Sequence, residues 1–164
     1  IKWPNDILLD GRKVCGILTE MNSEMQRVNY IVLGIGINLN QSQQDFPHDL
    51  RDKAVSLRMY ALKKGLKAGL LRRGDLIKST LLELDRVYTG IKKGNIGSIV
   101  EEWKKNSVTL GEEVRVITRN YEYEGVAVDI TGDGRLIVDC HDGKTREVFS
   151  GEVSIRGINQ NRGW

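Results

Sequence analysis

The residues of this chain that could do chemistry are concentrated before residue 40, in three short motifs. The first is K-W-P-N-D, Lys2–Asp6. Its proline removes one backbone donor and favours an extended conformation in the residue before it, so Asn5 and Asp6 lie where the chain turns. A carboxylate there suits Mg²⁺, which keeps part of its water and bridges phosphates. A surface turn with an Asx cap explains the same five residues equally well.

The second motif is K-V-C-G-I-L, Lys13–Leu18. Its lysine is either a charge at a sheet edge or a cation directed at an anionic ligand, which Gly16 would let approach the backbone. The third motif, G-I-G-I-N at Gly34–Asn38, places alternate glycines in an apolar strand and predicts a bare face for a flat ligand, oriented by Asn38. It is not a dinucleotide fingerprint, because Leu39 stands where a third glycine belongs.

Residues 1–40, which contain these motifs, have the pattern of strands. Asp10-Gly11 is a hairpin signal between two of them. The run Tyr30–Leu39 is almost continuously apolar, which predicts a strand buried on both faces. The first block therefore predicts a sheet that carries the candidate site.

Residues 41–107 have helical spacing instead. A short helix is predicted around Asp52–Leu62, a longer one with Asp75 as its N-cap, and a third that begins at Asn95. Apolar residues that recur at three- and four-residue steps are expected to form core: Leu76, Ile77, Leu81, Leu84, Tyr88, Ile91, Ile96, Ile99, Val100 and Trp103.

Residues 108–164 return to short strands separated by turns. Gly132-Asp133-Gly134 and Asp142-Gly143 supply the positive φ values that tight hairpins need. Five such strands in about fifty residues predict a small, highly curved antiparallel barrel. The strands are expected at Glu113–Thr118, Tyr123–Ile130, Arg135–Cys140, Thr145–Phe149 and Val153–Arg156.

Composition describes an ordinary globular protein: 164 residues, 40% hydrophobic and 29% charged, with a net charge of +3. That charge is too small to indicate nucleic-acid binding by itself. Cys15 and Cys140 have no C-x-x-C spacing and are interpreted as reduced thiols of a cytoplasmic protein. The one basic cluster in the sequence comprises Lys63, Lys64, Lys67, Arg72 and Arg73. It has no interleaved aromatic residues, which favours a solvated connecting segment over a nucleic-acid site.

In this order, the three motifs resemble the central motifs of the biotin protein ligases, also called biotin–[acetyl-CoA-carboxylase] ligases. The second motif extends to K-x-x-G-I-L-x-E at Lys13–Glu20, and S-G-E-V-S-I-R at Ser150–Arg156 resembles the closing stretch of that family's C-terminal domain. The resemblance implies an α+β fold. Residues 1–107 would be part of a catalytic domain like that of class II aminoacyl-tRNA synthetases, with a mixed sheet and helices. Residues 108–164 would be a small Src-homology-3-like β-barrel.

The resemblance also implies a reaction. ATP would activate biotin as biotinyl-5′-AMP, and a lysine of a biotin carboxyl carrier protein, from acetyl-CoA carboxylase or a related carboxylase, would accept the biotin. Lys13 would be the catalytic residue and contact the biotin carboxylate, while Gly16, Gly34 and Gly36 leave room for biotin. Asp6 would bind Mg²⁺. The residues expected on the nucleotide side are Lys2, Asn5, Asp6, Asn38, Glu152 and Arg156.

One family motif is missing. The loop G-R-G-R-x-G-R-x-W, which closes over the adenylate, precedes K-W-P-N-D in the family and does not occur in these 164 residues. The chain is therefore expected to be the second half of the catalytic domain with the C-terminal domain, and any DNA-binding domain would lie outside it. No membrane partner is expected, and homodimer formation stays open.

Several alternatives remain at this point. The chain could be a binding fragment without autonomous catalysis, or half of a biotin-sensing repressor. A lipoate protein ligase-like enzyme and a protein-interaction module are the other two. Biotin-stimulated exchange of pyrophosphate into ATP separates an active enzyme from a protein that only binds, and an interaction module predicts no response to biotin.

Overall fold

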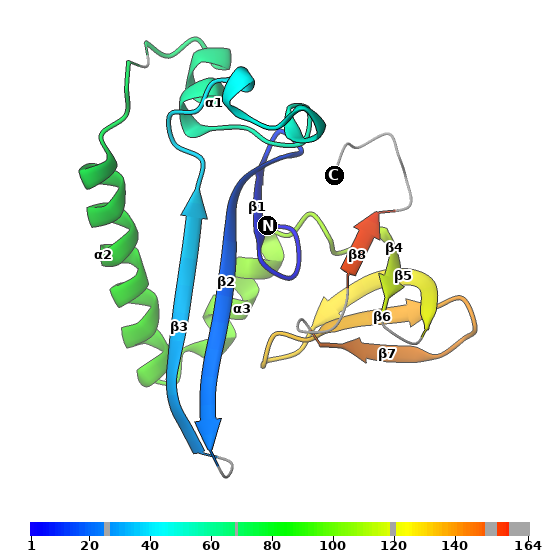
Figure 1. Ribbon diagram of the computed structural model, residues 1–164. Coiled ribbons are helices and arrows are strands. Elements are labelled where there is room, and N and C mark those ends of the chain that lie inside the picture. Colours follow the sequence, from blue (N-terminus) through cyan, green and yellow to red (C-terminus); the bar gives the residue numbers. More distant parts are fainter. Residues whose placement is uncertain (25–26, 68, 119–120, 150–153, 158–164) are drawn as a thin grey trace. The chain divides into compact units, whose positions relative to one another are not determined.

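A computed structural model describes residues 1–24, 27–67, 69–118, 121–149 and 154–157 (Figure 1). The chain forms two compact units. One consists of Asn5–Leu71, and the other combines Ile1–Pro4 with the described part of Arg72–Arg162. The predicted boundary between two domains, after residue 107, stays a prediction.

The unit Asn5–Leu71 is built on an antiparallel sheet in the order β1-β2-β3. Its strands are β1 (Asp6–Leu9), β2 (Arg12–Glu24) and β3 (Arg27–Ile37). The turn between β1 and β2 has positive φ at both Asp10 (49°) and Gly11 (76°), the backbone that a tight hairpin requires. The hairpin predicted at this dipeptide is confirmed.

Strand β3 is far more exposed than its sequence predicts. Tyr30 is 58% exposed and Leu33 46%, and they point to opposite faces of the strand. The prediction that Tyr30–Leu39 is buried on both faces is therefore wrong. The physical reason is that both faces of a strand are buried only where other elements pack on them, and the core of this unit reaches Ile37 but no residue of Tyr30–Gly36.

The helices of this unit are short. They comprise the 3₁₀ turns η1 (Gln43–Asp45) and η2 (His48–Leu50) and the helix α1 (Leu57–Lys63). The predicted helix around Asp52–Leu62 exists but begins only after Ser56, whose hydroxyl accepts the Met59 N–H at 3.1 Å. Residues of β2 and α1 and their neighbours form the core: Val14, Cys15 and Val55, with Leu9, Ile17, Ile37, Leu57, Met59 and Tyr60.

The other unit combines two helices with a five-stranded antiparallel sheet, which we call the C-terminal sheet, in the order β7-β6-β5-β4-β8. The first four predicted strands are confirmed, and so is the described part of the fifth, whose predicted first residue, Val153, lies outside the described residues. Gly134 and Gly143 have the positive φ predicted for their turns. Closure into a Src-homology-3-like barrel stays a prediction. The elements are α2 (Arg73–Lys92), α3 (Ile96–Lys105), β4 (Glu113–Ile117), β5 (Glu122–Ile130), β6 (Leu136–Cys140), β7 (Thr145–Val148) and β8 (Ser154–Gly157).

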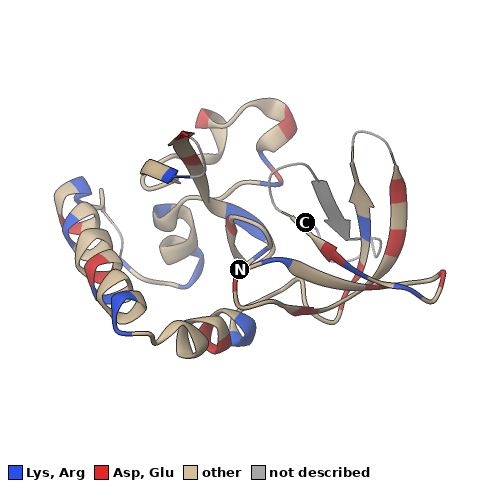
Figure 2. Cartoon of the chain, turned by 90° about the horizontal axis from the view of Figure 1, so that it is seen from below, with Lys and Arg blue, Asp and Glu red and all other residues tan. Residues whose placement is uncertain are grey.

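The two helices differ in burial. Val100 and Trp103 of α3 pack against the core of the C-terminal sheet, as predicted, whereas Ile96, which was also predicted to form core, is 44% exposed. In α2 no residue is buried, so the prediction that its apolar residues form core is wrong for this chain. Acidic and basic residues are interspersed along the same helix (Figure 2). Its N-cap is Arg72, and Asp75 lies within the first turn instead of capping it.

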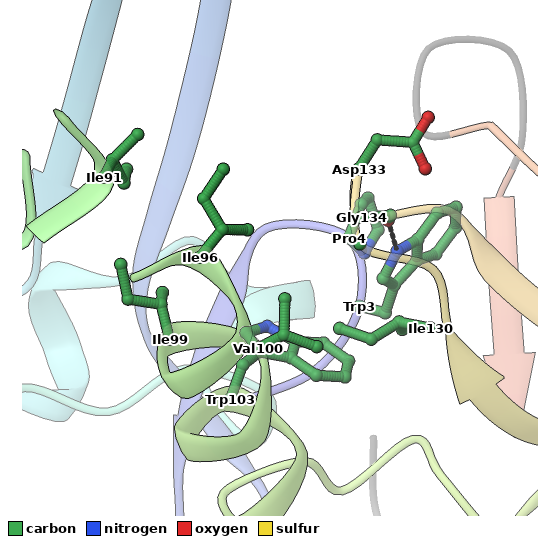
Figure 3. A pocket seen from close by; sticks show the side chains of 11 residues that line it. Trp3, Pro4, Ile91, Ile96, Ile99, Val100, Trp103, Ile130, Asp133 and Gly134 are labelled. Atoms are coloured by element: carbon green, nitrogen blue, oxygen red, sulfur yellow. Dashed lines mark hydrogen bonds between the residues drawn. The ribbon is translucent and has the colours of Figure 1, made fainter. Parts of the chain in front are cut away.

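The core of the C-terminal sheet contains one residue from the far end of the sequence. Trp3, of the K-W-P-N-D motif, is 3% exposed among side chains from β4 to β7, and its indole Nε1 donates to the Gly134 carbonyl at 3.0 Å (Figure 3). Both cysteines of the chain are free, as predicted, and both are buried. Among the described residues, no helix has the length and apolar character needed to cross a membrane. The other core residues are Val114, Val116, Ala127, Ile130, Leu136, Val138, Cys140 and Val148.

Candidate functional site

Strands β2 and β3 bring the three predicted glycines to one face of the sheet. Gly16 lies opposite Gly36, and Leu18 lies opposite Gly34. A methyl group on Gly34 or Gly36 would meet its nearest neighbours only at 3.8 Å, so these glycines leave open space. The result is an open cavity of about 490 Å³, lined by Asn5, Lys13, Gly16, Ile17, Leu18, Gly34, Ile35 and Gly36.

The side chain of Lys13 lies across Gly16. A methyl group on Gly16 would be 2.9 Å from the Lys13 Nζ and 3.0 Å from its Cε, so a larger residue would displace the lysine. The ammonium pairs with Asp6, at 2.6 Å from its Oδ1. The Lys13 side chain is still 48% exposed. An anion in the cavity can therefore reach this cation.

The backbone of Lys13 is fixed by the segment that precedes α1. Its N–H donates to the Lys53 carbonyl at 2.8 Å, and its carbonyl accepts the Val55 N–H at 2.9 Å. The Asn38 side chain also donates to the Lys13 carbonyl, at 3.3 Å. Asn38 thus supports Lys13 from the end of β3, a contact that the sequence pattern did not predict.

Asn5 and Asp6 enter the site from the start of β1. The Asn5 side chain donates to the Ile17 carbonyl at 2.7 Å, and the Asn5 carbonyl accepts the Ile17 N–H at 2.9 Å. Asp6 lies opposite Gly16 in the β1–β2 ladder, which places its carboxylate beside Lys13. The structure therefore brings Asn5, Asp6, Lys13 and the glycines together.

The remaining predicted residues belong to other parts of the chain. Lys2 belongs to the other compact unit. Glu152 lies outside the described residues, and Arg156 is in β8, opposite Arg115 of β4. Their roles stay predictions.

Sequence reasoning missed the apolar walls of the cavity, Ile17, Leu18 and Ile35. A signal for Leu18 was present, because a residue two positions after Gly16 points to the same face of a strand. Cys15 lies on the opposite face, in the core, and burial raises the pKa of its thiol. We therefore expect Cys15 to stay protonated and chemically inert near neutral pH.

The donor set for a metal ion is small. Within the described ranges there is no group of three or more His, Cys, Asp or Glu side chains that could hold one. Asp6 is a single carboxylate and already pairs with Lys13. It fits only an ion whose other ligands come from phosphate and water, which is the usual way proteins bind Mg²⁺.

Two family models match this chain. The model "Biotin/lipoate A/B protein ligase family" matches residues 1–38, which contain all three motifs. The model "Biotin protein ligase C terminal domain" matches residues 109–156, which cover the C-terminal sheet. The two matches lie in the order that the motifs predict.

Curated relatives match nearly the whole chain. The bifunctional ligase/repressor BirA of Bacillus subtilis is 36% identical over 155 residues, 94% of this chain and 46% of the relative. The biotin–[acetyl-CoA-carboxylase] ligase of Mycobacterium tuberculosis is 32% identical over 154 residues, 93% of this chain and 52% of the relative. The chain thus spans about half the length of the curated relatives it matches.

Solved structures agree with these matches. The apo structure of biotin protein ligase from Aquifex aeolicus superposes with a TM-score of 0.78 at 25% identity, over 96% of this chain and 64% of that one. The same enzyme in complex with biotin and ATP gives a TM-score of 0.74 at 25% identity, over 96% and 61%. Motif order, glycine-lined cavity and matching relatives lead to one conclusion: the chain belongs to the biotin protein ligase family.

Proposed function

We propose that this chain is the part of an ATP-dependent biotin ligase that holds biotin and its carboxylate. In the first half-reaction a biotin carboxylate oxygen attacks the α-phosphorus of ATP, and pyrophosphate leaves. In the second, the amine of a carrier-protein lysine attacks the carbonyl carbon of biotinyl-5′-AMP. AMP leaves with the bonding electrons, and the amine loses its proton. The names of the relatives and the complex with biotin and ATP support this reaction class.

The observation that carries the proposal is the cation at the end of a bare strand face. A flat bicyclic ring needs a surface without side chains, which Gly16, Gly34 and Gly36 supply. The carboxylate at the end of biotin's aliphatic side chain needs a positive partner, and the Lys13 ammonium lies over the first of these glycines.

The proposed role of Lys13 follows from electrostatics. The first half-reaction brings a carboxylate against a phosphate, and a fixed cation between them lowers the cost of that approach. Asp6 holds the ammonium in place, and an incoming carboxylate would share it or replace Asp6 as its partner. We propose that Asn5 and Asp6 line the nucleotide side. If Mg²⁺ accompanies ATP, Asp6 would be its protein ligand and the phosphates would supply most of the others.

A second candidate function comes from the name of the Bacillus subtilis relative, which is both ligase and repressor. In that case biotin or its adenylate would be a signal as well as a substrate. This candidate predicts ligand binding at the same site. It differs in expecting a further effect on DNA. Along α2, Lys and Arg are interspersed with Asp and Glu (Figure 2).

Two measurements on the full chain test the proposal. Isothermal titration with biotin is expected to show one binding site, and Gly36→Val, which fills the open face, is expected to abolish it. Gly90→Ala, in α2, is the matched control and should bind like the wild type. Biotin-stimulated pyrophosphate exchange then decides whether the chain also catalyses the first half-reaction. Absence of biotin binding by a folded wild-type chain would refute the proposal.

A further inference from the structure

The ion pair between Lys13 and Asp6 lies over one of the glycines that form the open strand face. A methyl group on Gly16 would be 2.9 Å from the Lys13 Nζ and 3.5 Å from the Asp6 Oδ1, so both charged atoms lie above this glycine. The two atoms are 2.6 Å apart. Two side chains of the unit Asn5–Leu71 therefore cover part of the surface that the proposed function assigns to a ligand.

The Asp6 oxygen in this pair depends on Lys13. It is buried and, among the described residues, accepts no hydrogen bond apart from the ion pair itself. A buried carboxylate oxygen holds its cation firmly, because water does not replace the lost partner. The backbone of Lys13 has other support, from Lys53, Val55 and Asn38, so Lys13 keeps its place in β2 without Asp6.

A carboxylate ligand at Lys13 would take the position that the Asp6 carboxylate has now. To pair directly with the ammonium, a ligand oxygen must come within about 3 Å of the Nζ, the usual length of such a bond. The Asp6 Oδ1 is already that close to the same atom. Two carboxylates on one ammonium repel each other, and a single positive charge cannot neutralise both. The ligand and Asp6 therefore compete for Lys13.

We propose that Asp6 is an internal competitor of the ligand, which occupies Lys13 in the empty site and must release it before a carboxylate binds. The ion pair is a feature of the structure, whereas the nature of the ligand rests on the proposed function. The opposite role is that Asp6 orients the ammonium toward the ligand, so that its charge assists binding. The two roles predict opposite effects when the charge of Asp6 is removed.

Isothermal titration of the full chain with two probes distinguishes these roles. The probes are biotin and biotinamide, in which a neutral amide replaces the carboxylate. Asp6→Asn keeps the shape of the side chain and removes its charge. We expect it to bind biotin about five- to tenfold more tightly than the wild type, the effect of removing one like charge from a partly exposed site. Its affinity for biotinamide should stay close to that of the wild type.

Asp10→Asn is the matched control. Asp10 belongs to the same unit and pairs with Lys63 at 2.8 Å, but it does not line the cavity. It has a positive φ, which asparagine also adopts readily. This variant changes the net charge by the same amount and should bind biotin like the wild type. Asp6→Glu keeps the charge and should not gain affinity. If Asp6→Asn does not fold, Asp6→Ser removes the same charge.

Each outcome decides the proposal. An Asp6→Asn chain that binds biotin no more tightly than the wild type would overturn the competition, and weaker binding would give Asp6 the orienting role instead. An equal gain for biotin and biotinamide would also overturn it, because the gain would not depend on the charge of the ligand. Failure of the proposed function has a different signature: neither the folded wild type nor folded Asp6→Asn would bind either probe, and the competition would be refuted with it.

Discussion

Lys13 is the residue on which the candidate site depends most. Its ammonium is half exposed, so the ion pair with Asp6 contributes little to stability. We expect Lys13→Ala to change the free energy of unfolding by less than about 1 kcal/mol. In a ligase with measurable activity, it should lower biotin-dependent pyrophosphate exchange by roughly 10²–10³, the usual cost of removing one such electrostatic partner.

The control for this prediction is Lys13→Arg. A planar guanidinium keeps the charge but does not fit the place of a compact ammonium over Gly16, so rescue should be incomplete. A thermal melt of each variant confirms folding. Near-normal exchange by a folded Lys13→Ala enzyme would remove Lys13 from the site.

Gly16 is the second residue whose substitution is informative. Its added methyl group would lie 2.9 Å from the Lys13 Nζ, and only the flexible end of that side chain must move. We expect Gly16→Ala to weaken biotin binding about tenfold with a change in stability below about 1 kcal/mol. A double-mutant cycle checks the cause, because in a Lys13→Ala background the methyl group has no ammonium to displace. Additive losses of affinity would show that Gly16 acts independently of Lys13.

At the scale of elements, β5 and β6 approach each other closely at Gly125. A methyl group there would lie 2.3 Å from the Asp139 carbonyl oxygen and 2.8 Å from the Cys140 Cα, both backbone atoms that cannot rotate away. We expect Gly125→Ala to lower the free energy of unfolding by at least about 2 kcal/mol in urea melts. Gly90→Ala, in the last turn of α2, meets Ile99 at an ordinary 3.9 Å and should stabilise by about 0.5 kcal/mol. A Gly125→Ala chain as stable as the wild type would mean that the strands can separate there.

The packing of α3 on β5 is supported by an ion pair. Lys104 hydrogen-bonds to Asp129 at 2.8 Å and holds the pKa of that carboxyl below its usual value, with help from the Ile130 amide. A carboxyl whose pKa is lower in the folded state stabilises the fold above its unfolded pKa. That contribution is lost as the pH falls through the folded value, here below about 4.

Removal of Lys104 should therefore change the pH profile of stability. In Lys104→Met, the melting temperature is expected to fall less between about pH 5 and pH 3 than it does in the wild type. Lys105→Met, its neighbour on α3, is the control for the loss of one positive charge. Identical pH profiles for the two variants would show that the Lys104–Asp129 pair contributes nothing.

At the scale of the whole molecule, the outer strand β3 predicts self-association. One edge of β3 is unpaired in its sheet, and Ile31 and Val32, on opposite faces, are 57% and 49% exposed. We expect sedimentation velocity to show oligomers that increase with concentration. Ile31→Lys should reduce them, whereas Leu66→Lys, at an exposed leucine outside the sheet, should not. A wild-type chain that stays monomeric at every concentration would contradict this prediction.

Local patterns in the sequence determined the tight turns of this protein and the glycine face of its candidate site. The glycines at Asp10-Gly11, Gly132–Gly134 and Asp142-Gly143 predict turns because few other residues adopt the backbone that a tight turn requires. The spacing of two between Gly34 and Gly36 predicts a bare strand face, because alternate residues of a strand share a face. These signals depend on a few neighbouring residues, so they can be recognised in the sequence without knowledge of the folded structure.

Tertiary structure decided which surfaces are buried and where the motifs divide. Tyr30–Leu39 has the composition of a buried strand, but its burial depends on which elements cover it. Trp3 lies two residues from Asn5 in the sequence and packs against residues more than a hundred positions away. The reason is physical: backbone propensity acts over a few residues, whereas packing and hydrogen bonds join segments that only the folded chain brings together.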